Sequence, residues 1–86
     1  MKQQYSLRRI GDNAGSDGRY SRAIAWNEDD TFKEDMGIRP VVGCSMMVGM
    51  GLSTHWLTTI VTEILEDTPK YVRFKTLNSE YEWKSK

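Results

Sequence analysis

Cysteine and histidine are almost absent from this chain, with one copy of each, Cys44 and His55. A single cysteine cannot form a disulfide within the chain, and it cannot build one of the cysteine-rich zinc sites. Asp12, Asn13 and Asp17 stand in a glycine-rich stretch, but they lack the alternation and the closing glutamate of a calcium loop. The sequence therefore predicts no metal and no cofactor.

The chain also lacks a charge excess, since lysine plus arginine and aspartate plus glutamate both number 12. Non-specific binding to nucleic acid draws most of its affinity from a basic excess, so this balance disfavours that function. The charges are unevenly placed, however. Residues 1–27 hold five basic residues against two acids, and residues 28–37 hold five acids against one lysine. We expect these two segments to attract each other or to lie on different faces.

No apolar run approaches the length of a transmembrane helix, and the first ten residues lack the apolar core of a signal peptide. With 38% hydrophobic and 28% charged residues, the composition is that of a globular domain. The length of 86 residues predicts one small domain, 1–86, and the cysteine usage suits the cytoplasm. A domain of this size has one core and little material for deep clefts.

Alternation of apolar and polar residues predicts a mainly β fold past Ile38, with a β core over residues 38–84. Residues 56–65 are rich in β-branched side chains and apolar on both faces, which is typical of a central strand. The runs on either side of the corner at Asn78-Ser79 predict a β-hairpin. Residues 4–10 and 19–26 are predicted to pair as a hairpin around a glycine-rich loop, and the alternative is that residues 1–21 are a flexible arm.

The stretch 28–36 is the one helix candidate. Asn27 or Asp30 can cap its start, acids crowd its first turn, and a glycine follows it. A helix this short needs Phe32 and Met36 buried in order to persist. The predicted fold is a small SH3-like partly open barrel or a bent antiparallel meander, with one short helix. The alternative is an α+β sheet with the helix across one face.

The sequence contains no catalytic signature. His55 follows Ser53 and Thr54, but the members of a catalytic triad normally converge from separate elements. The glycines around Gly43 and Gly49 lack the order of a phosphate-binding loop, and they predict a bend and a turn instead. We therefore predict that the chain is not an enzyme, and a small enzyme or ligand-binding protein ranks third among its functions.

The first-ranked function is a non-enzymatic module that binds another protein. Methionine suits an adaptable binding surface as well as an irregular core, so the region rich in methionine and glycine is the first candidate surface. Its residues are Met47, Met50, Leu52, His55 and Trp56. The second surface is the aromatic hairpin of Tyr71, Arg73, Tyr81 and Trp83, unless its glutamates pair with its bases as a solvated ladder. The expected partner is an unidentified protein, with a host factor and a second copy of the chain among the options.

The second-ranked function is a weak nucleic-acid-binding small β-barrel. If the hairpin register places the aromatic rings beside the bases, they form a stacking platform with cations. The residues of this alternative are Arg8, Arg9, Arg19, Arg22, Tyr71, Arg73, Tyr81 and Trp83. The interleaved glutamates disfavour it, because acids repel phosphates.

Three stretches, "RPVVGCSMMVG", "TTIVTEILE" and "VRFKTLNSEYEW", together resemble small uncharacterised proteins of bacterial phages and other mobile elements. The resemblance covers the C-terminal half of the chain and brings no catalytic residue with it. It implies a bacterial cytoplasm and a chain that works by binding, against or alongside a host factor.

Overall fold

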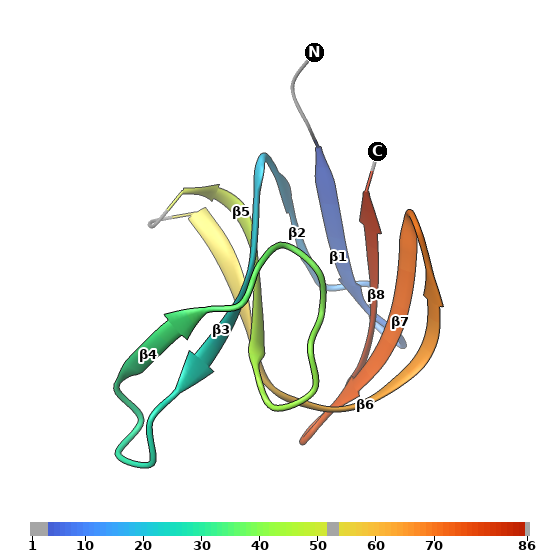
Figure 1. The fold of residues 1–86 in the computed structure, drawn as a ribbon. Coiled ribbons are helices and arrows are strands. Elements are labelled where there is room, and N and C mark those ends of the chain that lie inside the picture. The colour runs from blue at the N-terminus through green and yellow to red at the C-terminus, as the bar shows by residue number, and fades with distance from the viewer. Residues whose placement is uncertain (1–3, 52–53, 86) are drawn as a thin grey trace.

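The computed structural model describes residues 4–51 and 54–85, and these residues form one antiparallel sheet (Figure 1). The strands are β1 (Tyr5–Arg9), β2 (Gly15–Gly18), β3 (Tyr20–Trp26), β4 (Phe32–Asp35), β5 (Ser45–Gly51), β6 (Thr54–Thr68), β7 (Tyr71–Thr76) and β8 (Glu80–Ser85). Their order in the sheet is β2-β1-β8-β7-β6-β5-β3-β4. The prediction of a mainly β, antiparallel fold is confirmed. Across the described ranges, no helix has the length and apolar character needed to cross a membrane.

The helix predicted over residues 28–36 is wrong, because the chain makes a β-hairpin between β3 and β4. The backbone N–H and the hydroxyl of Thr31 both donate to Asp29 Oδ1, at 3.2 and 2.6 Å, and such bonds stabilise a turn in competition with a helix. Asp30 has a φ of 67°, which lies in the left-handed region. Phe32 is exposed, so the burial that a short helix requires is missing. The α+β alternative, which places that helix across one face, is wrong for the same reason.

The N-terminal segment extends the sheet beyond residues 38–84. Strand β1 forms a hairpin with β2 and also pairs with β8, so the predicted pairing of residues 4–10 with residues 19–26 is wrong. Strand β2 leads through Arg19 directly into β3, which pairs with β5. Gly18 allows this close passage, because a Cβ there would lie 2.1 Å from the Gly49 carbonyl oxygen. The edge strand β2 is thereby brought against β5.

Strand β6 bends the sheet at the other corner. Its first half pairs with β5 and its second half pairs with β7. Register shifts interrupt both pairings, and a β-bulge bends its strand and increases the local twist. The shift also changes which side chains point inward, since Val61 is buried while Leu57 is exposed. Together these two corners curl the sheet around one core (Figure 1).

The core takes its largest side chains from the inner face of the β7–β8 hairpin. Val72 lies opposite Trp83, and Phe74 lies opposite Tyr81. All four side chains are buried, and a large apolar side chain contributes about 1.5–3 kcal/mol when it is fully buried. The indole Nε1–H of Trp83 donates to Ser21 Oγ at 2.9 Å, so the core contains no unpaired indole donor there.

The connection between β4 and β5 arches in front of the sheet in Figure 1. It is tied to β3, because Ser21 Oγ donates to the Ile38 carbonyl oxygen at 2.7 Å. It is also tied to the β6–β7 turn, where Arg39 donates to the carbonyl oxygens of Thr68 and Pro69 at 2.8 and 2.9 Å. The Arg39 guanidinium lies 5.3 Å from the centre of the Trp83 ring. This connection therefore covers the core on the side where the curl is open.

Candidate functional site

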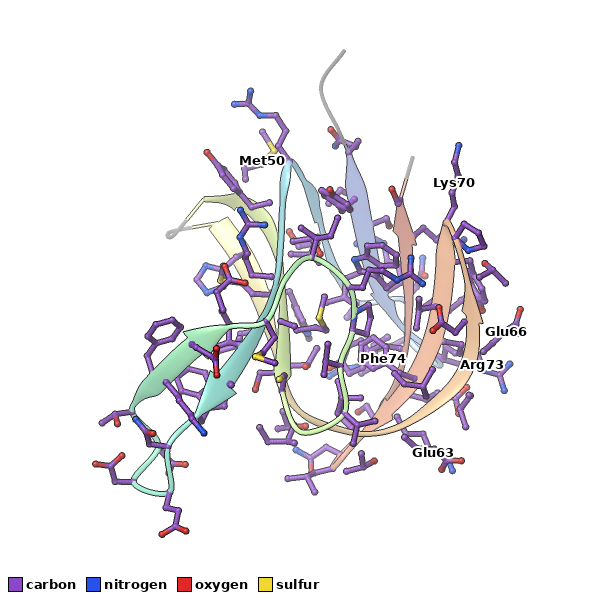
Figure 2. All side chains as sticks on the ribbon, viewed as in Figure 1. Met50, Glu63, Glu66, Lys70, Arg73 and Phe74 are labelled. Atoms are coloured by element: carbon purple, nitrogen blue, oxygen red, sulfur yellow. The ribbon has the colours of Figure 1, made fainter. Side chains whose placement is uncertain are left out.

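The outer surface of β6, β7, β8 and β1 is a ladder of alternating charges. The register places Glu66 opposite Arg73, Arg73 opposite Glu82, and Glu82 opposite Arg8. Arg73 Nε lies 3.0 Å from Glu80 Oε2, in an ion pair without the alignment of a hydrogen bond. Figure 2 shows Glu66 and Arg73 on the outside of the curl and Phe74 inside it. Opposite charges across strands stabilise a sheet by a fraction of a kcal/mol per pair. The charges on this surface therefore stabilise the sheet without a ligand.

The predicted aromatic hairpin surface is divided between the two faces of the sheet. Tyr81 and Trp83 point into the core, with 5% and 1% of their surface exposed. Tyr71 and Arg73 point outward, and the Tyr71 hydroxyl donates to Glu82 Oε2 at 2.9 Å. The structure does not bring these aromatic rings and bases together as a stacking platform. Their arrangement is that of a hairpin with one buried side and one solvated side.

The arginines of the nucleic-acid alternative are mostly engaged with aspartates. Ion pairs join Arg8 to Asp17 at 2.7 Å, Arg9 to Asp12 at 2.5 Å, and Arg22 to Asp35 at 2.9 Å. The bond from Arg9, with one from the Ala14 backbone N–H, lowers the pKa of Asp12 to about 2. Arg73 forms its ion pair with Glu80, and Arg19 is exposed in the link between β2 and β3. These residues do not gather into one basic surface.

Outward side chains of β3, β5 and β6 form a largely apolar surface, which we name the β3–β5–β6 face. One row of the register runs through Arg22, Met47 and Leu57, and the row beside it runs through Tyr20, Gly49 and His55. A third row runs through Ile24, Ser45 and Ile60. The side chains of the face are Tyr20, Arg22, Ile24, Trp26, Met47, His55, Leu57 and Ile60. Tyr20 and Leu57 are 48% and 44% exposed, so large apolar groups of this face meet solvent.

The predicted methionine-glycine surface coincides with this face only in part. Met47 and His55 lie on it. Met50 is exposed at the rim of the curl (Figure 2), and Leu52 falls outside the described residues. Trp56 lies on the inner side, where its Nε1–H donates to Tyr81 Oη at 3.2 Å and the Arg9 guanidinium covers its ring.

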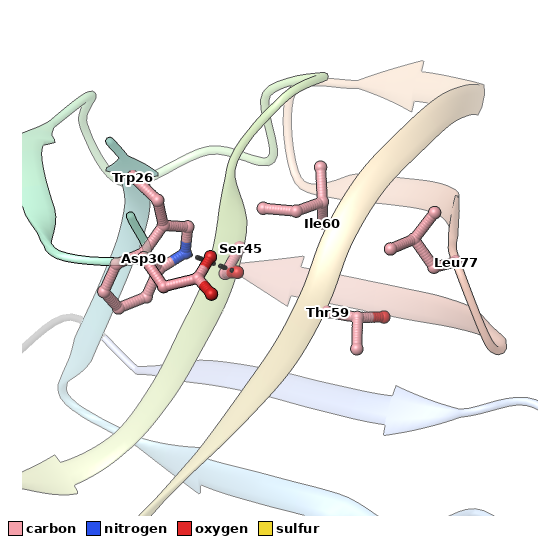
Figure 3. A pocket seen from close by; sticks show the side chains of 6 residues that line it. All are labelled: Trp26, Asp30, Ser45, Thr59, Ile60 and Leu77. Carbon is pink, nitrogen blue, oxygen red and sulfur yellow. Dashed lines mark hydrogen bonds between the residues drawn. The ribbon is translucent and has the colours of Figure 1, made fainter. Parts of the chain in front are cut away.

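A cleft of about 330 Å³ opens at one end of the β3–β5–β6 face (Figure 3). Its lining residues are Trp26, Asp30, Ser45, Thr59, Ile60 and Leu77. The Trp26 indole Nε1–H donates to Ser45 Oγ at 2.8 Å, which fixes the orientation of the ring. Figure 3 shows the Asp30 carboxylate beside that ring, with Ile60 and Leu77 across from it. This cleft was not predicted from the sequence, because Asp30 was expected in a helix and nothing indicated that Leu77 lies close to Trp26.

The described residues offer little for metal binding or for thiol chemistry. No group of three or more His, Cys, Asp and Glu side chains gathers within 4–51 and 54–85 in a way that could hold a metal ion. Cys44 is buried in the core, and burial raises the pKa of its thiol. A raised pKa lowers the fraction of the reactive thiolate at neutral pH.

No protein-family model matches the chain, and neither a curated protein nor a solved structure matches it.

Proposed function

We propose that the chain is a small non-enzymatic binding module whose partner protein docks on the β3–β5–β6 face. The observation that carries this proposal is the contrast between the two outer surfaces of the sheet. One surface places opposite charges next to one another across four strands, whereas the other exposes Tyr20 and Leu57 to solvent. Apolar area that stays exposed in the free protein gains about 25 cal/mol per Å² when a partner covers it.

The side chains of the face have the composition of an interface core. Aromatic residues, methionine and arginine are enriched in such cores, and the face supplies Tyr20, Trp26, Met47 and Arg22. The charge ladder is a less favourable docking surface, because a partner that covered it would have to remove water from its charged groups. The SH3-like form of the barrel, the phage or mobile-element setting and the cytoplasmic location remain predictions from the sequence.

The experiment compares partner capture by three immobilised proteins, which are the wild type, Leu57→Asp and Ile10→Asp. Leu57 and Ile10 are 44% and 43% exposed, so the two substitutions place the same charge at equally accessible positions, and only Leu57 lies on the face. From nuclease-treated lysate of the natural host, we expect the wild type and Ile10→Asp to retain the same protein. Leu57→Asp should retain it about tenfold less, which corresponds to about 1.4 kcal/mol of binding.

Sedimentation of the purified proteins tests a second copy as the partner. A concentration-dependent dimer that Leu57→Asp abolishes would identify the face as a self-association surface. Equal retention by Leu57→Asp and the wild type would refute the proposal. The absence of both a captured protein and a dimer would also refute it. Capture that occurs only from lysate without nuclease treatment would favour nucleic acid instead.

A further inference from the structure

The cleft beside Trp26 contains an aspartate that differs from every other aspartate in the described residues. Five aspartates accept a hydrogen bond from an arginine, from a hydroxyl or from a backbone N–H, and these are Asp12, Asp17, Asp29, Asp35 and Asp67. Within 4–51 and 54–85, the carboxylate of Asp30 has no hydrogen-bond or ion-pair partner. It is also the one that lines the cleft.

The turn between β3 and β4 holds Asp30 in this position. The Asp30 backbone N–H donates to the Asn27 carbonyl oxygen at 3.0 Å, and its φ of 67° is one that aspartate and asparagine tolerate. Glu28 and Asp29 precede it in the same turn, and residues 28–37 contain five acids against one lysine. Three acidic residues in succession, Glu28 to Asp30, therefore stand at this end of the cleft.

Apart from the hydroxyls of Ser45 and Thr59, the other walls of the cleft are apolar or aromatic. The bond from Trp26 to Ser45 uses the polar edge of the indole, so the ring can offer its π face. Ile60 and the largely exposed Leu77 lie across from it. A ligand that enters thus meets an apolar wall, an aromatic face and one carboxylate.

We propose that this cleft receives a long cationic side chain, lysine or arginine, from an exposed segment of the partner protein. The inference rests on the proposed function and assigns the chemistry that the partner presents. The methylene stem of such a side chain packs along apolar surface while its charged head stays near a polar group. Here the stem lies on Ile60 and Leu77, and the head lies between the Asp30 carboxylate and the Trp26 ring, where ion pairing and cation–π attraction act together. An apolar side chain would cover Asp30 without pairing it, which is unfavourable.

The test is an NMR titration with two small probes, N-acetyl-lysine N-methylamide and its neutral analogue N-acetyl-norleucine N-methylamide. The indole N–H signal of Trp26 reports on the cleft, and Trp26→Phe identifies it among the signals of the three tryptophans. The buried Trp83 indole serves as an internal reference. We expect the lysine probe to shift the Trp26 signal with millimolar affinity, about fivefold tighter than the norleucine probe, and to lose that advantage at about 0.5 M salt.

Two variants with the same change in charge separate the cleft from general electrostatics. Asp30→Asn keeps a residue that tolerates the left-handed turn, and Glu66→Gln removes a charge from the ladder instead. The preference for the lysine probe should disappear in Asp30→Asn and persist in Glu66→Gln. Equal binding of the two probes, equal effects of the two variants, or no shift of Trp26 at about 0.1 M probe would each overturn the inference.

The two proposals can fail separately. If Leu57→Asp abolishes partner retention while neither probe shifts the Trp26 indole signal, the face binds a partner and the cleft assignment alone is wrong. If the lysine preference is measured but Leu57→Asp retains its partner, the cleft assignment stands and the docking face is wrong.

Discussion

Replacement of Ser21 by alanine tests the hydrogen-bond pair that joins the core to the β4–β5 connection. Ser21 Oγ accepts from the Trp83 indole at 2.9 Å and donates to the Ile38 carbonyl oxygen at 2.7 Å. Trp83 is 1% exposed, so in Ser21→Ala its N–H loses this acceptor where water has little access. A buried donor without a partner costs about 1–3 kcal/mol. Ile38 is 40% exposed and its carbonyl oxygen can turn to water, so we place the whole loss at about 2 kcal/mol.

That loss is large enough to measure by urea denaturation and by calorimetry. In a domain of this size each kcal/mol lowers Tm by about 4–8 °C, so we expect Ser21→Ala to unfold about 8–16 °C below the wild type. Ser16→Ala is the control, because the Ser16 hydroxyl makes one long bond of 3.4 Å at the surface. Its free energy of unfolding should stay within about 0.5 kcal/mol of the wild-type value.

A double-mutant cycle shows whether the cost comes from the indole. In a Trp83→Phe background no donor faces Ser21, so the alanine substitution should cost much less there than in the wild type. A loss below about 0.5 kcal/mol in the wild type would refute the reasoning. An equal loss in both backgrounds would place its origin elsewhere.

Two further predictions concern the N-terminal half of the sheet. Gly18→Ala should cost at least about 3 kcal/mol in unfolding free energy, because the new Cβ would meet the Gly49 backbone at 2.1 Å, and an unchanged urea midpoint would contradict the close passage of β2 and β5. The pKa of Asp12 is lowered from 3.8 to about 2, so its bond to Arg9 stabilises the fold above pH 4 and is lost as the pH falls from about 4 to 2. Asp12→Asn should reduce the loss of stability over that interval, and a carboxyl titration midpoint near 4 in the wild type would show that the bond is not formed in solution.

The parts of the fold that could be predicted are those in which large apolar residues alternate with charges. The hairpin predicted around Asn78-Ser79 is such a part, and its Val72 and Phe74 are buried together because glutamates and bases occupy the other face. Residues 56–65 were predicted as one strand with two apolar faces, but a register shift in β6 puts Leu57 outside although Val61 is inside. An inserted residue of this kind leaves no mark in a period-two pattern. The helix over 28–36 was wrong because acids and asparagine that can cap a helix can also close a tight turn.

The candidate surface was harder to predict, because alternation does not say which face is inside. In β3 the small residues Ser21 and Ala23 point into the core, and Tyr20, Ile24 and Trp26 point outward. The usual expectation that large apolar side chains are buried assigns this strand the wrong way round. The cleft is further removed from sequence reasoning, since it needs Asp30, Ile60 and Leu77 from three distant segments.

Strand β4 is an edge strand, and an edge strand can pair through its backbone with another molecule. It stands at the margin of the sheet with β3 on one side, and its four side chains are all exposed. Lys33, Glu34 and Asp35 make this short margin charged, and short charged margins discourage the addition of strands from other molecules. The apolar surface beside β4 can therefore stay exposed with a lower risk of edge-to-edge pairing than a long apolar edge strand would carry.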